Sequence, residues 1–290
     1  MNNNNHRRTI LACIDGSTYR ESVTDYASWV AQKLSAPLKL LHNIEHRETP
    51  PLMDLSGSIG LGSREELLEE LTSMEERRSK ILLEQGKLML QSAHQRAISM
   101  GSSTPETLQR HGSLEETLVE MEEEIRVLVV GVRGEEHEHQ EKQLGAHLES
   151  LIRAMHRPVL VVNRPFEQPP QRIMIAYDGN EASRKALDMV SLSPLYRGLT
   201  CHIVHVSDSA DIPSAQLEEA AATLKNAGLD VVSTSLHGNV QPQLEQYCRK
   251  NNIELIVMGA FGQSRIRELL FGSVTQRMLI NSKIPLLLLR

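Results

Sequence analysis

Apolar and polar positions along the chain alternate between two kinds of segment. Short runs that are apolar throughout predict strands buried on both faces, as in a parallel sheet covered by helices. Longer segments with apolar residues at intervals of three and four predict amphipathic helices. In the first half we expect strands at 9–14, 38–44, 107–110, 125–130 and 158–162, and helices at 19–34, 65–100, 114–123 and 144–155. Gly86 marks a place where the long second helix could break.

The same order of elements appears again in the second half of the chain. There we expect strands at 172–177, 200–206, 229–235, 253–258 and 285–289, and helices at 182–192, 214–227, 240–250 and 275–280. Asp15-Gly16 and Asp178-Gly179 follow the first strand of each half, and His42 and His205 end the second strands. An internal duplication is the simplest explanation. We interpret both histidines as satisfied residues of the core or of the rim of the sheet rather than as catalytic bases.

The pattern divides the chain into two domains of ordinary size. Residues 1–163 form the predicted N-terminal domain, the proline-rich segment 164–171 a linker, and residues 172–290 the C-terminal domain. The loop at 45–63 and the helix after it are larger than their counterparts in the second half, so they could cover the cleft of the first domain.

Composition excludes several classes of protein. The net charge of −6 argues against binding nucleic acid by electrostatic attraction. No run reaches the roughly 18 apolar residues of a membrane span, and the polar N-terminus lacks the apolar segment of a signal peptide. Cys13, Cys201 and Cys248 show neither zinc-site spacing nor a disulfide framework, which favours a reducing compartment. We therefore expect a cytoplasmic protein without a membrane partner.

Residues suited to binding an anion follow the fourth predicted strand of the second half. Gly259 is followed by two residues and Gly262, and then by nine residues and Gly272-Ser273. Glycines let backbone N–H groups approach an anion, and the start of a helix adds unpaired N–H donors. The hydroxyls of Ser273 and Thr275 could bind phosphate oxygens. The glycines could instead only turn the chain, since neither common nucleotide signature, GxxxxGK[ST] or GxGxxG after a strand, is present.

The spacing Gly-x2-Gly-x9-Gly-Ser resembles the C-terminal ATP-binding signature of the universal stress protein (UspA-like) family. The resemblance extends to the Asp-Gly pairs, the strand-end histidines and the closing strands that follow a proline. It implies an α/β fold of two tandem, doubly wound, five-stranded parallel-sheet domains, Rossmann-like and similar to the adenine nucleotide alpha hydrolase group. It further implies that the closing strands at 158–162 and 285–289 pair antiparallel, so that the two domains form an intramolecular pseudo-dimer.

The resemblance also implies where ATP would bind in the C-terminal domain. Asp178 would face the ribose, and Val206 would offer backbone groups to the adenine. The phosphates would be surrounded by Gly259, Gly262, Gly272, Ser273, Val274 and Thr275. Gln263 and Arg265 could reach the same oxygens or lie on the surface. A Mg²⁺ ion would be held by the phosphates rather than by a protein metal site, and we assign no catalytic residue.

The first half departs from this pattern. It retains Gly131 and Gly134, but Ala146-His147 replaces the later Gly-Ser pair, so the hydroxyl is lost. Asn43 stands where the second half has Val206. The four carboxylates in 135–141 would repel a triphosphate. We therefore predict that nucleotide binds the C-terminal domain and that the N-terminal site is degenerate.

The acidic loop of the first half admits one alternative interpretation. His137 and His139 alternate with carboxylates and could bind zinc, although a solvated polar loop is the commoner explanation.

The favoured function is that of a universal stress protein, an ATP-binding regulatory protein of the stress response with at most slow ATP hydrolysis. One alternative is a scaffold of the same fold that no longer uses nucleotide. Another is a nucleotide-hydrolysing enzyme, although the sequence shows no recognisable Ser/His/Asp arrangement. Both a monomer and a homodimer are compatible with the sequence.

Overall fold

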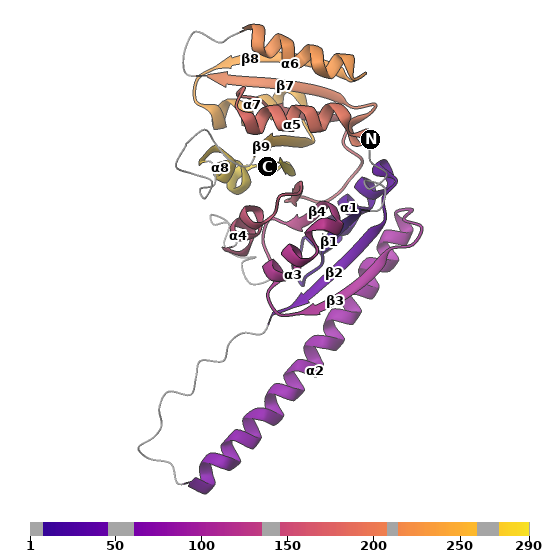
Figure 1. Ribbon diagram of the computed structural model, residues 1–290, viewed down its shortest axis with the longest axis vertical. Helices are drawn as coiled ribbons and strands as arrows, with labels where there is room; N and C mark the ends of the chain where they lie inside the picture. Colours follow the sequence, from indigo (N-terminus) through magenta and orange to yellow (C-terminus); the bar gives the residue numbers. More distant parts are fainter. Residues whose placement is uncertain (1–7, 46–60, 135–145, 208–213, 260–272, 290) are drawn as a thin grey trace.

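The computed structural model describes residues 8–45, 61–134, 146–207, 214–259 and 273–289. In these ranges ten strands form one sheet in the order β3-β2-β1-β4-β5-β10-β9-β6-β7-β8 (Figure 1). The strands of the first half are β1 (Thr9–Cys13), β2 (Leu38–Ile44), β3 (Glu106–His111), β4 (Ile125–Gly131) and β5 (Val159–Val162). Those of the second half are β6 (Arg172–Ala176), β7 (Thr200–Ser207), β8 (Asp230–His237), β9 (Leu255–Gly259) and β10 (Leu286–Leu289).

Strands within each half pair in parallel, and the two halves meet through their closing strands. β5 and β10 pair antiparallel, with Leu160 opposite Leu287. All four residues of each closing strand are buried. Pairing removes two apolar strand edges that would otherwise template aggregation. The predicted fold class and the antiparallel junction are both confirmed.

Helices cover both faces of the sheet, as expected for doubly wound domains. The helices of the first half are α1 (Arg20–Leu34), α2 (Leu61–Ser99), α3 (Leu114–Glu120) and α4 (Ala146–Ala154). Those of the second half are α5 (Glu181–Leu192), α6 (Ser214–Asn226), α7 (Val240–Asn251) and α8 (Ser273–Asn281). One core lies between the sheet and α1, α2, α5 and α6, and the other between the sheet and α3, α4, α7 and α8.

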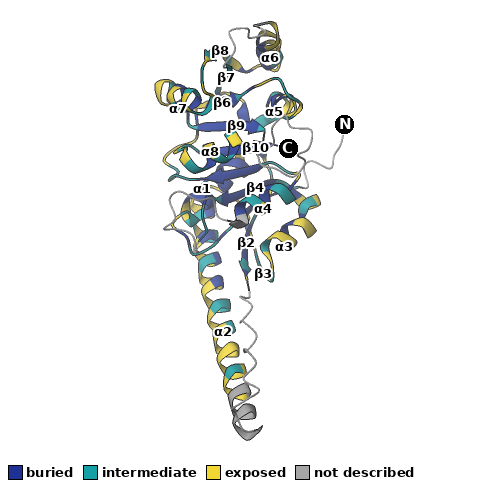
Figure 2. Ribbon diagram, turned by 90° about the vertical axis from the view of Figure 1, so that its left-hand side faces the viewer, coloured by how far each residue is buried: buried dark blue, intermediate teal, exposed yellow. Residues whose placement is uncertain are grey.

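Both cores continue across the junction between the halves. Successive residues of a strand face opposite sides of the sheet, so each closing strand contributes to both cores. Leu160 and Leu287 point into the first core, whereas Val161 and Leu286 point into the second. The junction is therefore packed like the interior of either half (Figure 2).

The predicted break at Gly86 is wrong, because α2 continues through it as a single 39-residue helix. A Cβ atom at this position would lie 2.2 Å from Nε2 of Gln109 and 2.4 Å from Cδ2 of His42. Glycine therefore lets the helix approach β2 and β3 closely, and this packing offsets its low helix propensity. Beyond the contact, α2 projects away from the sheet (Figure 1).

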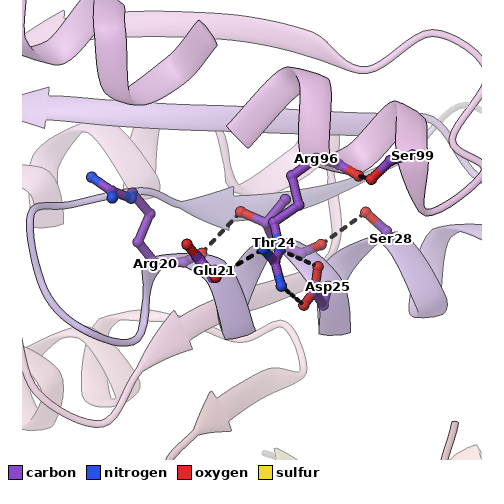
Figure 3. A network of polar contacts seen from close by, with 7 residues as sticks. All are labelled: Arg20, Glu21, Thr24, Asp25, Ser28, Arg96 and Ser99. Carbon is purple, nitrogen blue, oxygen red and sulfur yellow. Dashed lines mark hydrogen bonds and ion pairs between the residues drawn. The ribbon is translucent and has the colours of Figure 1, made fainter. Parts of the chain in front are cut away.

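An ion-pair network fastens the C-terminal part of α2 to α1 (Figure 3). Arg96 donates through Nε and Nη2 to the two carboxylate oxygens of Asp25, each at 2.7 Å, and through Nη1 to Glu21 at 2.8 Å. The Asp25 side chain is only 4% exposed. Because an isolated buried carboxylate is costly, the bidentate guanidinium makes this helix contact specific.

In the described ranges, no helix combines the length and the apolar character that crossing a membrane requires.

Candidate functional site

A cleft opens in the second half at the carboxyl ends of β6, β7 and β9. β6 lies between β7 and β9, so the chain connections leave β6 in opposite directions there. Such switch points are where doubly wound sheets bind ligands. The cavity has a volume of about 210 Å³. Its lining residues are Ala176, Tyr177, Asp178, Asn180, Ser183, Val204, Val206, Val240, Leu244, Met258, Gly259, Ser273, Val274 and Thr275.

Asp178 stands at the mouth of this cleft and is held by the start of α5. Its carboxylate accepts hydrogen bonds from the backbone N–H and the side-chain amide of Asn180, at 3.1 and 2.8 Å. Asn180 in turn caps α5 by accepting from the N–H of Ser183 at 2.7 Å. The role of Asn180 was not predicted, although an Asn after Asp-Gly and three residues before Ser183 is a typical capping signal.

Gly259 ends β9 beneath the cleft. A Cβ atom there would lie 2.8 Å from Cβ of Ala182, so the glycine is required for close packing of α5 against β9. Its carbonyl accepts a hydrogen bond from the buried hydroxyl of Thr275 at 3.3 Å. Thr275 therefore ties the start of α8 to the sheet, and its proton would have to turn away from Gly259 to reach a phosphate oxygen.

Of the remaining predicted residues, three lie in the described part of the chain and two lie outside it. Ser273 is exposed at the first position of α8, and Val274 and Val206 are partly buried in the cleft wall. The structure thus brings six of the eight predicted residues to one cavity. Gly262 and Gly272 lie outside the described residues, as do Gln263 and Arg265.

The strand-end histidines serve the scaffold in both halves. Nδ1 of His205 donates to the carbonyl of Tyr177, and Nδ1 of His42 donates to the carbonyl of Ile14, both at 2.8 Å. A carbonyl oxygen only accepts, so each Nδ1 carries a proton. Each histidine therefore joins the ends of two neighbouring strands at the rim, as predicted.

Comparison with known proteins identifies the family. The model of the universal stress protein family matches residues 6–163 and 170–290. The chain belongs to the universal stress protein family. It is 34% identical over 287 residues to universal stress protein Slr1230 of Synechocystis, which covers 98% of this chain and 100% of that protein.

Other universal stress proteins match over nearly the whole chain. Universal stress protein Rv1996 of Mycobacterium tuberculosis is 23% identical over 309 residues, covering 97% of this chain and 94% of that one. A crystal structure of a universal stress protein from Archaeoglobus fulgidus aligns with 100% of this chain and 99% of its own, at 19% identity and a TM-score of 0.71. This likeness shows the tandem fold. One universal stress protein solved in complex with cAMP aligns with 42% of this chain, at 26% identity and a TM-score of 0.37.

The cysteines of this universal stress protein are not activated nucleophiles. Burial raises the pKa of Cys13, Cys201 and Cys248 to about 12 each, and the nearby carboxylates Asp15 and Glu245 add to the effect at Cys13 and Cys248. A reactive thiol needs a lowered pKa. Cys201 and Cys248 are buried packing residues, and Cys13 is partly exposed at the end of β1.

A metal site has no support among the described residues, which contain no group of three or more His, Cys, Asp or Glu side chains suited to hold an ion. His137 and His139, the zinc alternative, lie outside them.

The first half carries a second cleft in the equivalent place, with a volume of about 800 Å³. Asp15 and Gly131 hold the positions of Asp178 and Gly259. At the place of Val206, the amide of Asn43 is already used, since it donates to the carbonyl of Gly112 and accepts from the hydroxyl of Thr117. The two clefts therefore share a location but differ in their walls.

Proposed function

We propose that the chain is an adenine nucleotide-binding regulatory protein of the stress-response type, in which the cleft of the C-terminal half binds ATP. The observation that carries the proposal is the meeting of Asp178, Val206, Gly259 and residues 273–275 around one cavity. These residues come from three strand ends and the start of a helix, separated by up to almost a hundred positions.

The residues present fit an adenine nucleotide. Val204, Val206, Val240 and Leu244 give one part of the cavity an apolar lining that suits an adenine ring. The exposed carboxylate of Asp178 can accept hydrogen bonds from ribose hydroxyls. The free N–H groups at the start of α8 favour an anion.

The size of the cavity indicates how the nucleotide would be arranged. At about 210 Å³ it is smaller than pockets that enclose a whole drug-sized ligand, which span roughly 300–1,000 Å³. We expect the adenosine part to be buried and the phosphates to extend toward Ser273. A Mg²⁺ ion would be held mainly by phosphate oxygens, because Asp178 is the one carboxylate among the described lining residues.

Binding is better supported than catalysis. Asp178 already accepts two hydrogen bonds from Asn180, and His205 uses Nδ1 on the carbonyl of Tyr177. No nucleophile paired with a base is found among the described residues of the cleft. ATP hydrolysis is therefore expected to be slow, with water as the nucleophile.

A charge substitution at the start of α8 tests the proposal. Ser273→Asp places a carboxylate where the phosphates would lie, at an exposed position where a negative charge is favourable for the helix itself. We expect ATP affinity, measured by isothermal titration calorimetry with Mg²⁺, to fall by at least about tenfold, or roughly 1.4 kcal/mol.

Ala146→Asp is the matched control. α4 and α8 are both nine residues long and begin at Ala146 and Ser273, so these two residues correspond, and the sequence comparison that aligned Ala146-His147 with Gly272-Ser273 is shifted by one residue. The Ala146→Asp substitution should leave the affinity unchanged. If protein freed of retained nucleotide binds no ATP, the function is instead that of a scaffold without nucleotide.

A further inference from the structure

The cleft of the first half has a wall that the second half lacks. Five residues of α2 line it: Arg78, Leu82, Gln85, Leu88 and Met89. Four of them are spaced four, three and four residues apart and lie along one side of the helix: Arg78, Leu82, Gln85 and Met89. In the second half the corresponding helix α6 has only 13 residues, and none of its described residues lines the cleft.

The end of the first cleft that corresponds to the proposed phosphate site is apolar. Leu148 occupies the position of Thr275 and is 6% exposed. Leu151 of the same helix lines this cavity, as do Val130 and Val132 around the end of β4. A triphosphate at this end would be desolvated without hydrogen-bond donors from these side chains, at a cost of several kcal/mol.

The charges on the wall also disfavour anions. Asp15 and Glu45 both line the cavity, and their carboxylates accept hydrogen bonds from Ser17 and from the N–H of Leu114. The one cationic side chain among the described lining residues, Arg78, is about half exposed and lies 3.7 Å from Oε1 of Glu75 on the same helix. Two carboxylates thus line this cavity, against one in the described lining of the second cleft, and each would repel a phosphate placed near it.

We infer that the first cleft is a separate binding site for a neutral or cationic, mostly apolar small molecule. A volume of about 800 Å³ is within the range of drug-sized ligand pockets, roughly 300–1,000 Å³. The apolar side chains would bury the body of the ligand, and Asp15 and Glu45 would receive its polar end. The inference does not depend on nucleotide binding in the second half.

The neutral dye Nile red is a suitable probe, compared with the anionic dye anilinonaphthalene sulfonate. In a fluorescence titration of the intact protein, we expect saturable uptake of one Nile red per chain and weaker binding of the anionic dye. Leu82→Glu places a charge on the cleft wall at a partly exposed position and should lower the Nile red affinity by about tenfold or more.

Ile81→Glu is the matched control, since Ile81 is the preceding residue of the same helix, is 58% exposed and does not line the cleft. It should leave Nile red binding unchanged. The inference is overturned if the unmodified protein shows no saturable uptake, if both substitutions weaken binding equally, or if the anionic dye binds more tightly.

Discussion

The two clefts of this tandem protein occupy equivalent places in two copies of one fold, yet their walls differ. The second cleft is small, and a serine and a threonine lie at the start of its final helix. The first is about four times larger by volume, with Leu148 at the place of Thr275 and a wall from the 39-residue α2. The position of a cleft is thus set by sheet topology, and its size and lining by a few side chains and one lengthened helix.

The features that the two halves share are those that build the sheet. His42 and His205 make the same hydrogen bond, and Gly131 and Gly259 each lie against the beginning of the first helix of their half, the second more closely than the first. Duplication therefore kept the scaffold contacts while the cleft walls diverged.

Weakening the attachment of α2 to α1 should have the largest effect on the first cleft relative to the second. Arg96→Ala leaves the Asp25 carboxylate buried without its cation, and we expect a loss of about 2–4 kcal/mol in the free energy of unfolding. Nile red binding to the first cleft should weaken, while ATP binding to the second should persist. Urea unfolding followed by circular dichroism measures the first effect.

Lys87→Ala is the control for this change. Lys87 forms an exposed ion pair with Glu84 on the same helix, so its removal should cost less than about 1 kcal/mol. Equal losses for Arg96→Ala and Lys87→Ala would contradict the assigned role of the buried network.

Adding a methyl group at the equivalent glycines Gly131 and Gly259 should reduce the stability of the protein by different amounts. In Gly259→Ala the new Cβ would lie 2.8 Å from Cβ of Ala182, which forces α5 away from β9 and should cost about 1–3 kcal/mol of stability. In Gly131→Ala the nearest atom, Cβ of Tyr19, is 3.1 Å away, so the loss should be smaller.

Thermal unfolding of the two alanine variants, with ATP affinity measured on both, checks this expectation. Gly259→Ala should also weaken ATP binding, whereas Gly131→Ala should not. A larger loss of stability at Gly131 would mean that packing at the second cleft is looser than the structure indicates.

The remaining effect appears only above pH 9, so it is the smallest of the three at neutral pH. Burial raises the pKa of Cys248 from 9.0 to about 12, so the folded protein keeps this thiol protonated where the unfolded chain loses the proton. The stabilising contribution is complete below pH 9 and declines as the pH rises toward 12, by at most about 1.4 kcal/mol per pH unit.

Replacing the thiol isolates this contribution from other groups that titrate in the same range. In Cys248→Ala, the decline of the free energy of unfolding between pH 9 and 12 should be less steep than in the unmodified protein. Identical slopes would show that the thiol does not contribute.

Much of the fold could be predicted from the sequence because its signals are local. Strands that are apolar throughout, such as 158–162 and 285–289, indicated a covered parallel sheet, and the antiparallel pairing of these two strands was implied by the family resemblance. Repetition of the Asp-Gly and histidine positions indicated the duplication. These patterns depend on residues close together in the chain.

The parts that could not be predicted depend on contacts between distant residues. The need for glycine at Gly86 arises from Gln109 and His42, which are far from it in sequence. Likewise, Gly259 suggested a ligand loop, whereas its described contact is with Ala182. The larger size of α2 in the first half indicated that it could cover the first cleft, but which of its residues line the cavity depends on how the helix lies on the sheet.

The most direct test of two distinct clefts is a titration of Nile red into the full-length protein saturated with ATP and Mg²⁺. If the clefts bind different classes of ligand, one dye and one nucleotide should bind per chain, and the dye affinity should equal that measured without ATP. Competitive displacement of the dye by ATP would show that both ligands share one site and would contradict the division between the two halves.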